Sequence, residues 1–218
     1  MIIKSKPLSP FLFRVAVLLI TFVFKRKCKR LVIEPCDIKP EHSYILMCNH
    51  FSFWDGFFAY YMIHKVLFKT GHMKNLYVMS LKKQMEKNPW MRYTGSFSVD
   101  PGRRSINESF DYAAEILAEP GNVLLFYPQG KLESNHIRYI KFDEGIYEIV
   151  QRVKSNCQLL WSSNIIEFFE SLKPTVYGYM LDCGTNKDFN FEGLKDKVNQ
   201  HHKASIMRNV RYTVEPEN

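Results

Sequence analysis

From residue 43 onward, short apolar runs alternate with longer segments in which apolar residues recur every three or four positions. Short runs rich in β-branched and aromatic residues are typical of buried strands, and the longer spacing is typical of amphipathic helices. A chain in which strands alternate with helices is expected to form an α/β domain, with a largely parallel or mixed central sheet flanked by helices. The predicted strands are residues 44–48, 76–79, 97–99, 123–127, 158–161 and 175–181, and the predicted helices are residues 56–68, 81–87, 105–118, 143–154 and 163–171.

An apolar segment that ends in a cluster of positive charge precedes this region. Residues 11–24 read FLFRVAVLLITFVF, and residues 25–30 read KRKCKR. A helix over residues 11–24 is roughly 21 Å long, whereas the hydrocarbon core of a bilayer is about 30 Å thick. We therefore expect an N-terminal membrane-docking helix that dips into one leaflet, with the basic cluster against anionic headgroups. The alternatives are a helix packed on a soluble domain with an exposed basic end, and a single membrane span.

Outside its first 40 residues, the chain carries almost no net charge. Residues 1–40 hold nine lysines and arginines against two acidic residues, which accounts for +7 of the formal net charge of +8. A basic surface on the body of the protein is therefore not expected, and nucleic acid is not among the predicted partners. The charge beside the apolar segment instead predicts an anionic membrane surface as partner. It also predicts peripheral or monotopic attachment to the cytoplasmic face of the cell (inner) membrane.

These patterns divide the chain into three predicted parts. Residues 1–40 form the membrane-associating segment, residues 41–198 form the α/β domain, and residues 199–218 form a polar C-terminal tail. The five cysteines include no CxxC pair, and no cysteines and histidines stand at the spacing of zinc ligands. We therefore expect reduced thiols in a reducing cytoplasm and no metal site.

Polar residues collect directly after the first predicted strand, at the kind of position where α/β domains place their chemistry. Asn49 and His50 follow this strand, and Asp55 stands where the next helix begins. A carboxylate in that first turn can accept a hydrogen bond from one imidazole nitrogen and leave the other nitrogen as a general base. Asn49 and Ser52 are expected to support the loop through side chain to backbone hydrogen bonds. The alternative is a histidine with a purely structural role.

Two further loops carry residues suited to an anionic substrate. Gln129, Gly130 and Lys131 follow the strand 123–127, where glycine permits close backbone approach and an ammonium group can meet a phosphate. Arg103 and Arg104 follow the strand 97–99, and guanidinium groups bind phosphate through two parallel hydrogen bonds. The alternative is that both segments are ordinary turns. The predicted substrate-binding residues are Asn49, Ser52, Arg103, Arg104, Gln129, Gly130 and Lys131.

Four segments, taken in order, together resemble one known family. They are Asn49-His50-x4-Asp55, Gly95-Ser-Phe-Ser-Val-Asp100, Tyr127-Pro-Gln-Gly130 and Phe142-Asp-Glu-Gly145. The chain is similar over about residues 43–181 to the glycerolipid acyltransferases, whose first block is the HxxxxD motif. The best-known members of that family make phosphatidic acid from lysophosphatidic acid.

The resemblance implies a membrane-associated O-acyltransferase. It would move a fatty acyl group from an acyl thioester, acyl-ACP or acyl-CoA, to the hydroxyl of a lyso-glycerolipid such as lysophosphatidic acid. His50 would be the general base, and Asp55 would orient it. No cofactor is expected beyond acyl-ACP or acyl-CoA as co-substrate, and the implied partners are the membrane, the lyso-lipid acceptor and acyl carrier protein.

Three positions depart from the pattern of that family. Pro101 stands where the family has a phosphate-binding arginine, Gln129 replaces a glutamate, and Leu132 stands where an arginine is common. These departures keep open an acyltransferase for a phosphate-free acceptor such as a lyso-aminolipid. A further alternative is a non-catalytic lipid-binding protein with the same fold.

Overall fold

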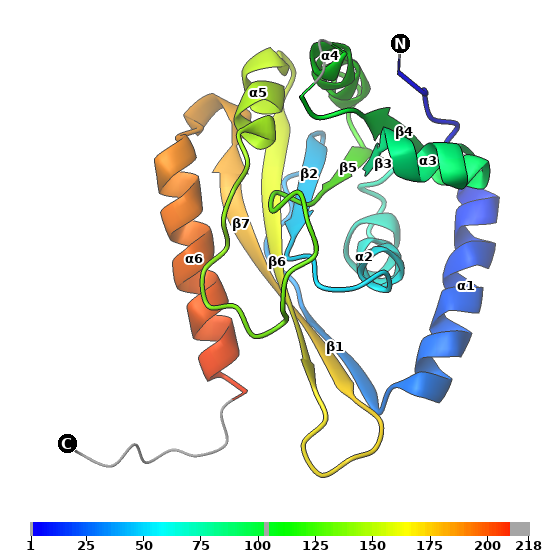
Figure 1. Ribbon diagram of the computed structural model, residues 1–218, viewed down its shortest axis with the longest axis vertical. Coiled ribbons are helices and arrows are strands. Elements are labelled where there is room, and N and C mark those ends of the chain that lie inside the picture. Colours follow the sequence, from blue (N-terminus) through cyan, green and yellow to red (C-terminus); the bar gives the residue numbers. More distant parts are fainter. Residues whose placement is uncertain (1, 103–104, 210–218) are drawn as a thin grey trace.

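Seven strands form one mixed sheet in the computed structural model, which describes residues 2–102 and 105–209 (Figure 1). The strand order is β1-β7-β6-β2-β5-β3-β4. The strands from β4 to β6 run parallel, β7 runs antiparallel to β6, and β1 runs parallel to β7. The predicted α/β fold with a mixed central sheet flanked by helices is therefore confirmed. The strands are β1 (Arg30–Glu34), β2 (Ser43–Cys48), β3 (Asn75–Leu81), β4 (Ser96–Val99), β5 (Asn122–Phe126), β6 (Cys157–Glu167) and β7 (Thr175–Thr185).

Helices cover both faces of the sheet, and the central strand β2 is buried along its whole length. Because successive residues of a strand point to opposite faces, Ile45 and Met47 pack on one face while Tyr44, Leu46 and Cys48 pack on the other. Figure 1 shows α6 on one side of the sheet and α1 with α2 on the other. The first face carries α4 (Ile106–Leu117), α5 (Gly145–Arg152) and α6 (Phe191–Met207), and the second carries α1 (Pro10–Lys27), α2 (Asp55–Ile63) and the π-helical turn His64–Phe68. The remaining helical segments are α3 (Lys82–Lys87) and the 3-10 turns Pro89–Thr94 and Asn186–Asp188.

Residues 163–171, predicted as a helix, are mostly strand. They continue β6 as far as Glu167 and then form the turn that leads into β7. Ile165 and Ile166 are β-branched and lie opposite Tyr177 and Val176 of the antiparallel partner strand. The helix prediction is wrong because pairing with β7 decides the conformation, and a short apolar cluster does not distinguish a strand from a helix.

Helix α6 crosses the predicted boundary between residues 198 and 199 and runs to Met207. The polar tail expected from residue 199 is thus helical over residues 199–207, and residues 210–218 lie outside the described part of the chain. The buried face of α6 contains Leu194, Val198, His202 and Ser205. Two of these residues are polar, so the stripe that holds the helix against the sheet does not look apolar in the sequence.

Helix α1 confirms the helix predicted over residues 11–24, and it has one buried and one exposed apolar face. Phe13, Val17 and Phe24 are buried. The ring of Phe13 packs on those of Tyr60 and Phe68, with centroids 5.7 and 5.2 Å apart. Across residues 2–102 and 105–209, every helix falls short of the length and apolar character needed to cross a membrane. The exposed apolar residues of α1 are Phe11, Leu12, Val15, Leu18, Leu19, Phe22 and Val23.

Candidate active site

The two strand ends that the sequence singled out lie side by side. Strands β2 and β5 are parallel neighbours, with Met47 opposite Phe126. The loop after β2, residues 49–54, therefore lies beside the loop after β5, which begins at Tyr127. The sheet topology brings together His50 and Gln129, which are 79 residues apart in the sequence.

His50 and Asp55 form the hydrogen-bonded pair that the motif predicts. His50 Nδ1 lies 3.0 Å from Asp55 Oδ2, and the two side chains are 26% and 2% exposed. The same carboxylate oxygen accepts hydrogen bonds from the backbone N–H groups of Phe51 (2.7 Å) and Ser52 (2.8 Å). Asp55 is also the first residue of α2, where the helix dipole favours a negative charge. The carboxylate is thus held by the backbone of its own loop as well as by the imidazole.

The partner of Nδ1 decides which nitrogen of His50 is basic. A carboxylate accepts hydrogen bonds and donates none, so the proton of a neutral imidazole lies on Nδ1, which donates to Asp55. The lone pair of a neutral His50 is then on Nε2. This is the arrangement of a general base whose tautomer is set by an orienting carboxylate.

The segment 127–133 supports His50 through contacts separate from those of Asp55. The ring of Tyr127 stacks on the imidazole, with centroids 4.2 Å apart and planes 26° from parallel. The backbone N–H of His50 donates to Gln129 Oε1 (2.7 Å), and its C=O accepts from the N–H of Glu133 (2.9 Å). Burial raises the pKa of the Tyr127 phenol well above its usual value, so this ring stays neutral beside the imidazole.

Asn49 belongs to the framework of the site. It is 2% exposed. Its Nδ2 donates to the C=O of Asn164 (2.9 Å), and its Oδ1 accepts from the N–H of Asn164 (2.7 Å). This reciprocal pair joins the end of β2 to β6. Both ends of the Asn49 amide are thus used inside the fold, in the side chain to backbone bonds expected for this residue, and its role in substrate binding stays a prediction.

Gln129, also predicted to bind the substrate, makes internal contacts in the structure. Its side chain accepts from the backbone of His50 and donates to the Glu133 carboxylate, and the residue is 5% exposed. Ser52 Oγ accepts a hydrogen bond from the N–H of Trp54 (2.9 Å), which is the loop support expected for this residue. Both residues shape the loops that hold His50.

Two other predicted residues remain available to a substrate. The Lys131 side chain is 69% exposed, and its Nζ lies 3.4 Å from a carboxylate oxygen of Glu133. Gly130 is exposed and has a φ of 65°, and a Cβ there would come within 2.2 Å of Asp143 Oδ2. A side chain at residue 130 is therefore disfavoured on both conformational and steric grounds. Arg103 and Arg104 lie outside the described residues.

The sequence missed three residues of the site: Tyr127 as a stacking partner, Glu133 and Asn164. Glu133 lies four residues beyond Gln129 in an irregular loop, where no helical or strand periodicity predicts which side chains meet. Asn164 lies in the segment predicted as a helix. Only the parallel placement of β2 beside β5 and β6 would have indicated these partners.

Two apolar cavities lie along α2. The smaller, about 30 Å³, is lined by Phe51, Trp54 and Asp55 together with Phe24 and Phe58, so it reaches the carboxylate partner of His50. The larger, about 430 Å³, lies near the other end of α2 and is lined by residues of β1, α2 and the π-helical turn and by the segments that follow β1 and that turn. None of the residues lining the larger cavity comes from the loops around His50. Among the described residues, no group of three or more His, Cys, Asp or Glu side chains is placed to hold a metal ion.

Comparison with known proteins adds a family and a fold. The sequence model of the family "Acyltransferase" matches residues 29–162. The fold is similar to the crystal structure of the 1-acyl-sn-glycerophosphate (LPA) acyltransferase PlsC from Thermotoga maritima, with a TM-score of 0.60 and 15% sequence identity. The match covers 92% of this chain and 81% of that one. No curated protein matches this sequence.

Proposed function

The chain belongs to the acyltransferase family, and we propose that it transfers a fatty acyl group from a thioester to the hydroxyl of a lysophospholipid. The observation that carries the proposal is the His50–Asp55 pair, with Nδ1 bound to a buried carboxylate and the imidazole partly exposed. It lies at the carboxyl end of β2, inside the matched residues. The similar fold of a lysophosphatidic acid acyltransferase supports the choice of acceptor class.

The geometry supports a direct transfer with His50 as the base. His50 Nε2 takes the proton of the acceptor hydroxyl while the hydroxyl oxygen forms a bond to the carbonyl carbon of the thioester. The carbon–sulfur bond then breaks, and the leaving thiolate takes the proton back from the imidazolium. Asp55 stabilises the transient imidazolium and holds the ring in place. A thioester is already activated, so positioning and one general base suffice.

The first experiment incubates the purified full chain with acyl-CoA and acyl-ACP donors and a panel of lyso-lipids. We expect His50→Ala and Asp55→Asn to lower kcat by roughly 10²–10⁴-fold, the range of general-base catalysis. His136→Ala is the matched control, because His136 is exposed and is not among the described contacts of His50 or Asp55. Unchanged transfer in His50→Ala would remove the base from the proposal, and absence of transfer by the wild type would favour a lipid-binding protein.

The headgroup of the acceptor is part of the same proposal. Lys131 is paired with Glu133, which reduces the positive charge that it offers to a phosphate. This pairing, together with Pro101 in the place of the family's phosphate-binding arginine, favours a phosphate-free lyso-aminolipid as the second candidate acceptor. The panel therefore includes lysophosphatidic acid and a lyso-aminolipid, and the ratio of their kcat/KM values decides between them.

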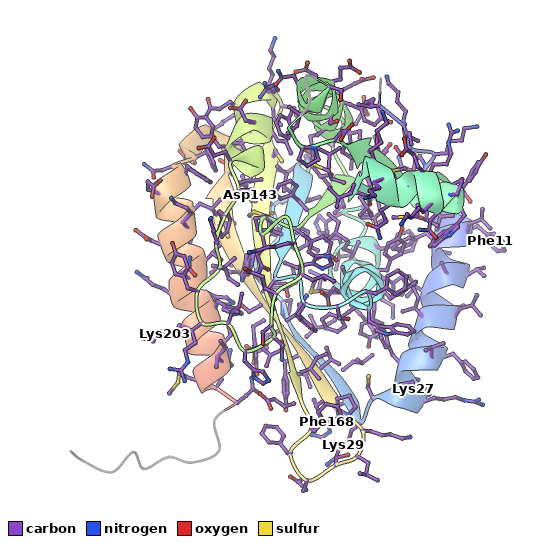
Figure 2. All side chains as sticks on the ribbon, viewed as in Figure 1. Phe11, Lys27, Lys29, Asp143, Phe168 and Lys203 are labelled. Atoms are coloured by element: carbon purple, nitrogen blue, oxygen red, sulfur yellow. The ribbon has the colours of Figure 1, made fainter. Side chains whose placement is uncertain are left out.

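We also propose that the outer face of α1 docks on an anionic bilayer at the cytoplasmic face of the membrane. Phe11 and Leu18 on that face are 72% and 68% exposed, and the helix ends in Lys25, Arg26 and Lys27. Figure 2 shows Phe11 near one end of α1 and Lys27 at the other. Apolar side chains can enter one leaflet while the basic end meets the headgroups.

The turn between β6 and β7 extends this docking surface. Phe168 and Leu172 are 55% and 99% exposed, and Figure 2 shows Phe168 at the same end of the molecule as Lys27 and Lys29. The backbone N–H of Lys29 donates to the C=O of Pro174 (2.7 Å), which fixes the turn beside the end of α1. The rings of Phe24 and Trp54 lie 6.5 Å apart, so α1 also contacts the loop that carries His50.

Flotation with vesicles tests the docking. Leu18→Glu/Leu19→Glu changes side chains that are 68% and 64% exposed, so the fold should be retained. Each leucine removed from the bilayer costs about 1.5–3 kcal/mol of binding, so we expect a loss of binding to phosphatidylglycerol vesicles of more than tenfold. Met207→Glu on α6, 54% exposed, is the control. Equal binding by the double variant and the wild type would contradict docking through α1.

A further inference from the structure

The backbone of His50 is held at two points by the loop after β5, once by the side chain of Gln129 and once by the backbone of Glu133. Gln129 is 5% exposed, and its Oε1 accepts the His50 N–H at 2.7 Å. Its Nε2 donates to the Glu133 carboxylate. The N–H of Glu133 in turn donates to the His50 C=O at 2.9 Å. Both polar groups of the His50 backbone are therefore bound to the segment 129–133.

The chemistry of the two neighbours fixes the direction of the Gln129 amide. An amide side chain has one end that accepts and one that donates. The His50 N–H requires an acceptor, and the Glu133 carboxylate requires a donor, so only one of the two amide orientations satisfies both. A hydrogen bond to a carboxylate is also stronger than one between neutral groups. The charge of Glu133 thus keeps Oε1 turned toward His50.

Both oxygens of Glu133 have partners. One accepts from Gln129, and the other lies 3.4 Å from Lys131 Nζ. The Glu133 side chain is 21% exposed, so this carboxylate is partly withdrawn from solvent. The described contacts that link Glu133 to His50 run through the amide of Gln129 and through the His50 C=O.

We propose that Glu133 is a positioning residue for His50, acting through the amide of Gln129. This inference rests on the proposed function, in which the direction of His50 Nε2 determines the rate of proton transfer. A histidine two residues beyond the end of a strand has a backbone that is no longer held by the sheet. The Gln129–Glu133 pair replaces the lost strand contacts at that position and fixes the residue from which the imidazole projects.

A charge exchange between the two residues tests the pair. Gln129→Glu places a second carboxylate against Glu133, so the hydrogen bond becomes a repulsion. Glu133→Gln keeps a hydrogen-bonding partner for Gln129. In Gln129→Glu/Glu133→Gln, the carboxylate introduced at residue 129 accepts from the His50 N–H and also from the amide introduced at residue 133. The double variant therefore restores the network with the charge on the other residue.

The expected order of kcat follows from these contacts. We expect Gln129→Glu to lower kcat by about 10–100-fold, the size of coupling found within one hydrogen-bond network, and Glu133→Gln to lower it by less than about fivefold. We expect the double variant to recover to within about fivefold of the wild type, with KM for the lyso-lipid changed by less than about twofold throughout. Glu115→Gln is the control, because Glu115 lies on the outer face of α4 and pairs only weakly with Lys4.

Two measurements that need no substrate distinguish a displaced His50 from an unfolded variant, and they remain informative if the proposed activity is absent. Thermal melting shows whether each variant is folded, and the Nδ1–H signal of labelled His50 in NMR spectra reports its bond to Asp55 without any substrate. We expect this signal to be weakened in Gln129→Glu and restored in the double variant. A double variant as impaired as Gln129→Glu, while folded, would overturn the role of Glu133. If the wild type transfers no acyl group, the proposed function fails, and the NMR cycle still confirms or overturns the positioning of His50.

Discussion

Two histidines of this chain, His50 and His202, differ in their burial and in the partners of their ring nitrogens. His202 is completely buried on α6. Its Nδ1 lies 3.1 Å from Ser163 Oγ, and its Nε2 lies 3.0 Å from the C=O of Ile137. His50 has a described hydrogen bond at Nδ1 and a side chain that is 26% exposed. One imidazole has a partner at each nitrogen, and the other is held at one nitrogen by a charge.

The His202 network has a single consistent direction. Trp161 Nε1 can only donate, and it lies 2.8 Å from Ser163 Oγ, so the Ser163 hydroxyl is free to donate to His202 Nδ1. Nε2–H then donates to the C=O of Ile137. Every polar group in this chain of contacts is satisfied by a neutral partner, which stabilises packing and leaves no reactive nitrogen. Around His50, a buried carboxylate replaces the neutral partners, and this difference supports the chemical role proposed for His50 and a structural role for His202.

Substitution of each histidine should produce opposite results. In His202→Ala, Ser163 and Ile137 lose their partner inside the core and a cavity forms, so we expect unfolding to become easier by about 2–4 kcal/mol. The folded fraction should keep its kcat. His50→Ala should lose activity and keep its melting temperature within a few degrees.

Thermal melting gives the stability of each variant, and kinetics at a single temperature on the same preparations gives its kcat. His201→Ala is the matched control for α6, because His201 is the neighbouring, partly exposed residue whose Nε2 contacts the Tyr179 C=O. A His202→Ala protein with unchanged stability would show that the buried network is not a structural one, and the comparison would fail.

Much of the candidate site could be predicted from the sequence, because its residues are local. His50 and Asp55 are five residues apart, and a strand followed by a helix places them in one bend. The neighbouring loop was also predictable, since the carboxyl ends of parallel strands lie at one edge of a sheet. What a loop residue contacts was not predictable. Gln129 is predicted from the sequence to meet the substrate, and nothing in the sequence indicates that its side chain binds the backbone of His50, 79 residues away.

The errors in the fold have the same physical origin. The segment 163–171 carries an apolar cluster that suits either a helix or a strand, and only its pairing with β7 selects the strand. The buried face of α6 includes His202 and Ser205, which become acceptable in a core once their hydrogen bonds are made. Sequence periodicity detects burial through apolar residues, so it underestimates elements whose buried face is polar and satisfied.

The pH dependence of stability is the smallest effect expected from the comparison. Burial lowers the pKa of His202 below its usual value of 6.5, and the charge of His201 lowers it further, against the hydrogen bond to Ile137 that raises it. The unfolded chain therefore binds a proton at this residue at a higher pH than the folded chain does. It follows that the contribution of His202 to stability is complete above about pH 6.5 and is lost as the pH falls from there toward the folded pKa, by at most about 1.4 kcal/mol per pH unit. Burial also lowers the pKa of His64, with the charges of Lys69, Lys65 and Arg14 acting in the same direction, so the pH profile of the wild type alone does not isolate the contribution of His202.

We expect denaturant unfolding between pH 7.5 and 5.5 to show a steeper loss of stability in the wild type than in His202→Gln, which has no proton to take up at this position. Parallel pH profiles for the two proteins would contradict a buried neutral imidazole at His202.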